Sequence, residues 1–172
     1  MRNKFIAYLS GVLLTAFCAT ALIAGAAEKR EQTFVKSNFK TVYRTVHAVD
    51  DVPNHEVVQE MTVADIRISN PDFKTKEEWA YVHSDLVNGN GPHSGYFFDT
   101  QEDGSITYGT FKGMVKTTTK ADGSWESTWE GTYQYLGGSG KFKNLKGNGT
   151  YKGRVSSQNP AIHEEGRETV QY

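Results

Sequence analysis

Residues 124–135, SWESTWEGTYQY, alternate so regularly between two kinds of residue that they predict a β-strand with one buried face. The odd positions carry aromatic residues, serine and glycine, whereas the even positions carry glutamate, threonine and glutamine. Successive side chains of a strand point to opposite faces of the sheet. We therefore expect Trp125, Trp129 and Tyr133 to face a core and the even positions to face solvent.

The preceding segment, FKGMVKTT, predicts the partner strand of a hairpin. A three-residue loop at 121–123, with its glycine at positive φ, keeps apolar residues opposite apolar residues. In that register Phe111 faces Tyr133, and Gly113 faces Gly131. Two facing glycines leave a gap in the inner wall, which either lets the sheet coil tightly or makes room for a ligand.

Similar alternation, broken by turn residues at short intervals, recurs along the chain and predicts eight strands. They are expected at residues 33–47, 56–69, 78–87, 94–100, 105–119, 124–135, 148–155 and 163–170. So many short strands in one domain indicate a sandwich or a closed barrel. We expect an all-β fold, a single antiparallel eight-stranded barrel. Only residues 70–79 have helical character, and the sequence leaves open whether residues 156–172 close the barrel or form a tail.

The first 27 residues have the pattern of a secretory signal peptide. Arg2 and Lys4 precede an apolar run, which ends in the small residues of Ala24-Gly25-Ala26. The alternative is an uncleaved membrane anchor, for which the run is nearly long enough. We expect cleavage, a mature barrel domain at 28–172 that is secreted or periplasmic, and no stable membrane insertion after cleavage.

The composition of residues 28–172 excludes several classes of function. The chain has one cysteine, Cys18, so the mature domain has no disulfide, no thiolate metal site and no cysteine nucleophile. Without Arg2 and Lys4, 17 basic and 20 acidic residues remain, a net charge of −3. This balance argues against nucleic acid as a partner.

The glycine-rich stretch GGSGKFKNLKGNGTYKG does not have the spacing of a phosphate-binding loop, because Phe142 follows Gly140-Lys141. It resembles instead the strand–turn–strand signature of allene oxide cyclase-like and dirigent-like barrels, a resemblance that covers residues 94–155. The matching elements are Gly137, Gly138, Gly140, Phe142, Leu145, Gly147, Gly149 and Tyr151.

The resemblance implies a calycin-like antiparallel barrel with an apolar cavity. Members of this group include plant cyclases, guides of phenoxy-radical coupling, bacterial polyketide cyclisation enzymes and exported bacterial proteins. The signal peptide makes the chain most similar to the exported bacterial branch. No catalytic residue of these proteins matches a residue here, so the resemblance implies no particular activity.

Two groups of polar residues are candidates for chemistry. Residues 47–55, HAVDDVPNH, hold two imidazoles and two carboxylates but match no metal-ligand spacing, so we expect a polar loop, no metal and no cofactor. The second group is His83, Asp85 and His93, of which His83 and Asp85 share a strand face with Trp79 and Tyr81. If that face is internal, the pair is a candidate general acid and base; otherwise it is a solvated pair at the rim.

The aromatic residues are the candidate ligand-binding set, since they provide apolar surface with a few polar handles. The residues expected to line the interior are Trp125, Trp129, Tyr133, Phe111, Tyr81 and Phe98. The favoured hypothesis is a protein that binds a small apolar or aromatic molecule in its interior. The alternatives are a cofactor-independent cyclase or isomerase and a non-catalytic structural or interaction protein. The sequence decides neither the ligand nor the oligomeric state.

Overall fold

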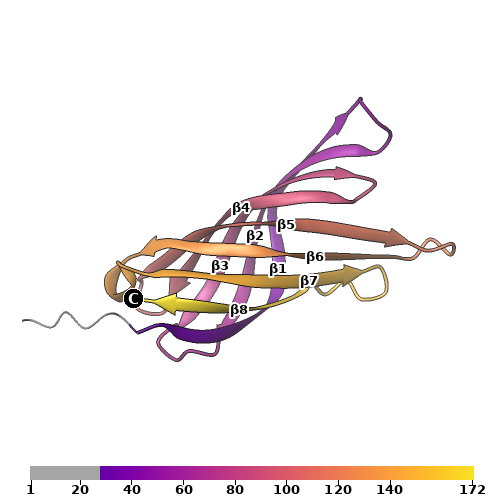
Figure 1. Ribbon diagram of the computed structural model, residues 1–172. Helices are drawn as coiled ribbons and strands as arrows, with labels where there is room; N and C mark the ends of the chain where they lie inside the picture. The colour runs from indigo at the N-terminus through magenta and orange to yellow at the C-terminus, as the bar shows by residue number, and fades with distance from the viewer. Residues whose placement is uncertain (1–27) are drawn as a thin grey trace, which may run out of the picture.

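The computed structural model describes residues 28–172 as a closed barrel of eight antiparallel strands, each hydrogen-bonded to the next in chain order (Figure 1). The strands are β1 (Arg30–Val49), β2 (His55–Ile68), β3 (Thr75–Val87), β4 (Gly91–Gln101), β5 (Ile106–Thr119), β6 (Trp125–Gly138), β7 (Lys146–Ser156) and β8 (His163–Gln171), with a 3₁₀ turn η1 (Gly140–Phe142) between β6 and β7. The predicted eight-stranded barrel is confirmed. The signal peptide expected at 1–27 lies outside the described residues. No helix within 28–172 is long and apolar enough to cross a membrane.

The chain's last strand closes the barrel. β8 pairs with β1 from Arg30↔Val170 to Lys36↔Glu164, so most of the C-terminal segment is part of the wall rather than a tail. The register expected for the β5–β6 hairpin is also confirmed, with Gly113 opposite Gly131. The loop turns at Gly123, which has a φ of 81°.

Aromatic side chains on the inner face lie over glycines of the neighbouring strands. A Cβ added to Gly149 would lie 2.7 Å from Cε1 of Tyr133, its direct partner in the sheet. The ring–glycine partners are Phe34–Gly166, Phe97–Gly109, Phe111–Gly95, Trp129–Gly153, Tyr133–Gly149, Tyr135–Gly147 and Tyr151–Gly131. The rings therefore cover the adjacent backbone instead of reaching across the barrel.

The gap predicted at the facing glycines of β5 and β6 is occupied by side chains. A Cβ added to Gly113 would lie 2.8 Å from the hydroxyl of Tyr151 and 2.8 Å from Cε1 of His93. Gly131 likewise lies under the Tyr151 ring. The glycine pair thus makes room for these two side chains against the wall.

An aromatic plug fills the end of the barrel where the C-terminus lies (Figure 1). Phe142 of η1 is fully buried, and its ring centroid lies 4.6 Å from that of Phe73 and 5.2 Å from that of Tyr172. Of residues 70–79, expected to have helical character, residues 70–73 form a hydrogen-bonded turn and residues 75–79 belong to β3. This turn brings Phe73 under the barrel, so any opening to the interior is at the opposite end.

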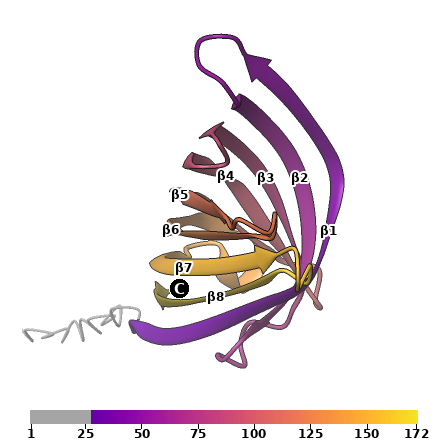
Figure 2. The same ribbon diagram turned by 90° about the vertical axis from the view of Figure 1, so that its right-hand side faces the viewer.

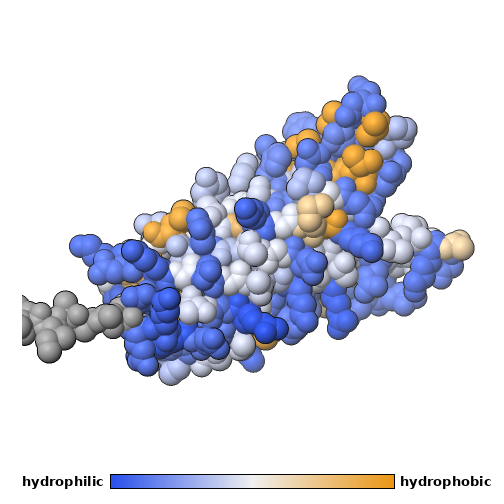
Figure 3. Space-filling view, in the orientation of Figure 1, coloured by the Kyte–Doolittle hydropathy of each residue, from blue (hydrophilic) through white to orange (hydrophobic). Residues whose placement is uncertain are grey.

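The opposite end carries the long β1–β2 hairpin, which extends beyond the neighbouring strands (Figure 2). Exposed apolar side chains gather on it, among them Val42, Tyr43 and Val46. The space-filling view shows orange residues on this hairpin and mostly blue and pale residues on the outer face of the strands in front (Figure 3). On the face seen in Figure 3, the strands below the hairpin therefore present a mostly polar surface.

Candidate functional site in the barrel interior

A cavity of about 330 Å³ occupies the interior between the aromatic plug and the β1–β2 hairpin, and every strand contributes to its lining. This volume is at the small end of the range of roughly 300–1,000 Å³ typical of small-molecule sites. Its apolar lining includes Phe34, Phe97, Phe111, Trp129, Tyr133 and Tyr151 together with Val58, Ala80, Val82, Leu86 and Val115. The site accepts a small molecule that is mostly apolar.

A buried ammonium group with two carboxylates lies at the cavity wall. Nζ of Lys36 is 2.6 Å from Oε1 of Glu78 and 2.9 Å from Oε1 of Glu164, and all three side chains are largely buried. Burial opposes the charge of Lys36, but the two carboxylates outweigh it and raise its pKa. Lys36 is therefore held as a cation inside an apolar cavity.

The acid cluster continues from Glu78 to the neighbouring strand, where Asp99 is its direct partner. Asp99 is fully buried, and burial, reinforced by the charge of Glu78, raises its pKa well above the ordinary value. Oδ2 of Asp99 accepts a hydrogen bond of 2.7 Å from the hydroxyl of Thr107. The other oxygen of Asp99, Oδ1, has no hydrogen-bond partner among the described residues. The raised pKa favours the protonated form of Asp99.

Trp129 is fixed by the same cluster. Its indole Nε1–H donates to Oε2 of Glu164 over 2.6 Å, while the ring lies over Gly153. Because Glu164 also contacts Lys36, the aromatic wall of β6 and the charged group of β1 are joined through a single carboxylate.

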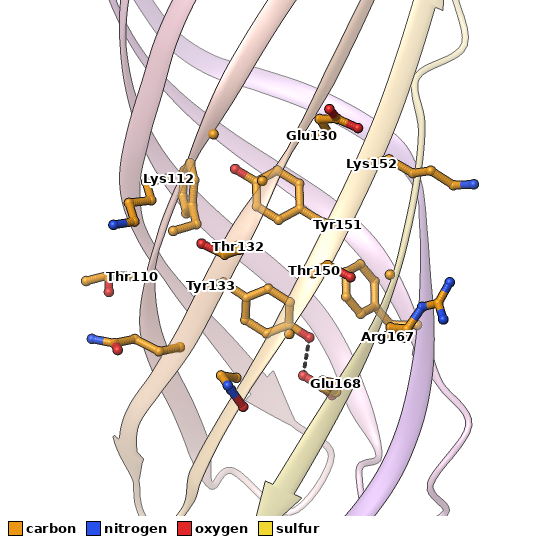
Figure 4. Close-up of a pocket in the computed structure, with 18 of the residues that line it drawn as sticks. Thr110, Lys112, Glu130, Thr132, Tyr133, Thr150, Tyr151, Lys152, Arg167 and Glu168 are labelled. Carbon is orange, nitrogen blue, oxygen red and sulfur yellow. Dashed lines mark hydrogen bonds between the residues drawn. The ribbon is translucent and has the colours of Figure 1, made fainter.

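A second buried acid, Glu168, is hydrogen-bonded to Tyr133 of the cavity wall. The Tyr133 hydroxyl donates to Glu168, towards which it points in Figure 4, and Gln32 Nε2 donates to the other carboxylate oxygen. Burial raises the pKa of Glu168 and of Tyr133. These bonds fix the Tyr133 ring as part of the cavity wall.

His93 is the buried imidazole of the site, with only 6% of its surface exposed. Its Nε2 lies 2.6 Å from the hydroxyl of Tyr151, and its Nδ1 has no hydrogen-bond partner among the described residues. Burial lowers the pKa of His93, so the ring is neutral near pH 7.

The structure places three of the six predicted ligand-binding aromatics in the cavity wall, namely Phe111, Trp129 and Tyr133. The other three, Tyr81, Phe98 and Trp125, are absent from that lining and are 45%, 45% and 39% exposed. The ring of Phe98 on β4 stacks on Trp79 of the neighbouring strand β3, with ring centroids 6.2 Å apart.

His83 and Asp85, the predicted candidate acid and base, also lie on the outer face of β3 and are exposed. The condition for an internal pair is thus not met. Asp85 accepts a hydrogen bond of 2.6 Å from Nε2 of His55, whose Nδ1 contacts Asp51 at 2.5 Å. Asp51 and His55 of the 47–55 segment therefore take part in an external contact with β3.

The interior acids and Lys36 were missed by sequence reasoning. The even positions of β3, among them Glu78 and Ala80, face the cavity, and so do Lys36 of β1 and Glu164 of β8. A usable signal was the presence of small apolar residues at alternate positions of β3, since Ala80 and Val82 share the face of Glu78.

No family model matches the chain, and no curated protein sequence matches it. Among solved structures, the chain is similar to a pterocarpan synthase dirigent protein, with a TM-score of 0.34 and 13% sequence identity over 86% of this chain and 87% of that one. A likeness at this TM-score carries no argument about activity. The pairing of the eight strands in chain order itself defines the fold class.

Proposed function

We propose that the protein binds a small, largely apolar molecule in the interior of its barrel. The observation that carries this proposal is the cavity of about 330 Å³, which has an apolar lining. The aromatic plug closes one end of the barrel. A solid structural or interaction protein would have no need of such a void.

We also propose that binding takes place outside the cytoplasm, in line with the resemblance to an exported bacterial branch of these barrels. The support is the signal-peptide pattern of residues 1–27. Expression of the full chain should yield an exported product whose N-terminal sequence begins at or just before Glu28. An intact N-terminus on a membrane-bound product would contradict the proposal.

Binding is tested with 2-ethylnaphthalene, an apolar probe of two fused rings, titrated into residues 28–172 by calorimetry. Ala80 lines the cavity, whereas the next residue, Tyr81, is exposed on the outer face. We expect one-to-one binding that falls at least about tenfold in Ala80→Phe, whose ring occupies the space of the ligand, and is unchanged in Tyr81→Ala. Equal affinity in Ala80→Phe and the wild type would place the probe elsewhere and overturn the proposal.

A second candidate function is a cyclase or isomerase, and the observation that favours it is the Lys36, Glu78 and Glu164 cluster at the cavity wall. Such a cluster can donate and accept protons while the enclosed site positions and desolvates a substrate. An enolisable ketone such as 2-tetralone should then exchange its α-protons for deuterium faster with the protein than without it. The exchange should disappear in Glu164→Gln; equal exchange in that variant contradicts this function.

A further inference from the structure

Lys36 has a hydrogen-bond donor that the protein does not use. An ammonium group carries three N–H donors, and the contacts of Lys36 within residues 28–172 account for two of them, one to Glu78 and one to Glu164. The Phe34 ring, whose centroid lies 5.1 Å from Nζ, covers part of the group. One charged N–H is thus left without a protein acceptor.

This donor lies at the wall of the cavity, since Lys36, Glu78 and Glu164 all belong to its lining. A donor that carries a full charge forms stronger hydrogen bonds than a neutral one, and an apolar environment strengthens them further. Glu164, in contrast, is paired twice, since it also accepts a hydrogen bond from Trp129. The free N–H of Lys36 is therefore the strongest unpaired donor that this cluster offers to a ligand.

We propose that Lys36 is the polar anchor of the ligand and donates its third hydrogen bond to a neutral carbonyl-type oxygen of an otherwise apolar molecule. This inference rests on the proposed function of the cavity and names the class of ligand that the cavity takes.

The charges around Lys36 select a neutral oxygen. Glu78 and Glu164 already balance the ammonium, so a ligand carboxylate would be a third negative group in a buried space. A cationic ligand would meet the ammonium itself. The two carboxylates also keep Lys36 protonated, which argues against an imine bond between its amine and a ligand carbonyl.

Three ligands of nearly one shape test the anchor: 2-ethylnaphthalene, 2-acetylnaphthalene and 2-naphthoate. We expect 2-acetylnaphthalene to bind the wild type about tenfold more tightly than 2-ethylnaphthalene, the ratio expected for one hydrogen bond to a charged donor. The carboxylate should bind more weakly than the ketone. In a spectrum of ¹⁵N-labelled lysine, the ammonium signal of Lys36 should shift with the ketone and much less with the hydrocarbon.

A variant that neutralises the whole cluster completes the test. Lys36→Met with Glu78→Gln and Glu164→Gln leaves no unpaired carboxylate, and it should lose the preference for the ketone while still binding 2-ethylnaphthalene. The matched control is Lys152→Met with Glu165→Gln, an exposed pair 3.0 Å apart on the outer face, which should keep the preference.

The outcomes separate the two proposals. Equal affinities for ketone and hydrocarbon in the wild type, with the Lys36 signal unmoved, overturn the anchor and leave the cavity as a binding site. Failure of all three ligands to bind overturns the proposed function. Because the signal of Lys36 is measured on the wild type, the anchor is decided even if the triple variant does not fold.

Discussion

The two halves of the barrel wall are built on different principles. All fifteen glycines of the described chain lie within residues 89–166, and none lies within 30–88. In the glycine-rich half, β4 to β8, aromatic rings lie over glycines of the adjacent strands and thicken the wall. In the glycine-free half, small apolar side chains such as Ala80 and Val82 face the interior, and Lys36 and Glu78 project their charges into it. The barrel keeps a cavity because the large rings pack sideways over glycines and residues of the opposite half such as Ala80 and Val82 are small.

The largest effect is expected in the glycine-free half, where Lys36→Met leaves the carboxylates of Glu78 and Glu164 buried without a cation. Removal of one member of a buried ion pair costs about 3–5 kcal/mol, and we expect a loss of that order in urea denaturation. The triple variant that also carries Glu78→Gln and Glu164→Gln should recover most of it. A single variant as stable as the wild type would mean that water reaches the cluster freely.

The glycine-rich half should fail when a side chain is placed under a ring. Gly149→Val forces the Tyr133 ring away from the wall and should cost about 1–3 kcal/mol, the usual penalty for overpacking. Thr150→Val, on the same strand but facing solvent, is the control and should stay within about 0.5 kcal/mol of the wild type.

An enlarged side chain in the glycine-free half should be tolerated. Ala80→Phe adds a ring that points into the cavity, where there is space for it. The penalty for overpacking a filled core should therefore not arise, and the free energy of unfolding should change by less than about 1 kcal/mol. Equal losses for Ala80→Phe and Gly149→Val would remove the distinction between the two halves.

The acid at the junction of the two halves should make stability depend on pH. The pKa of Asp99 is raised in the folded state, so its contribution is complete below the unfolded value of about 3.9 and is lost as pH rises through the folded value. Asp99→Asn retains an acceptor for Thr107 and has no charge to bury. We expect the variant to be more stable than the wild type at neutral pH, with a gap that narrows towards pH 4. A gap independent of pH contradicts this assignment.

The smallest effect concerns the contact between turns at the open end. Hydrogen bonds to Asp85 and Asp51 raise the pKa of His55. The contact is therefore complete below the unfolded pKa of about 6.5 and is lost as pH rises through the folded value. Amide signals of Asn54 and Asn88, which are hydrogen-bonded across these turns, should shift with that titration and not in His55→Gln.

The sequence predicts the strands and the β5–β6 register well because both depend on local alternation and on a turn glycine. It does not predict the inner face of β3, since Trp79 and Tyr81 on one face compete with Ala80 and Val82 on the other. The pairing with β4 decides the matter, because it sets Ala80 beside the buried Phe97. Local sequence patterns do not predict the cluster of Lys36, Glu78 and Glu164, since these residues belong to β1, β3 and β8 and meet only in the closed barrel.

Closure of the barrel by β8 has a consequence for folding. Lys36 and Phe34 obtain Glu164 and Gly166 as partners only when the first and last strands pair, across more than a hundred residues of sequence. Contacts so distant in sequence form late and slowly in β-proteins. Until then two strand edges are open to pairing with other chains. Completion of the ligand site and protection against aggregation are therefore one event, and a ligand that binds only the closed barrel should disfavour its reopening.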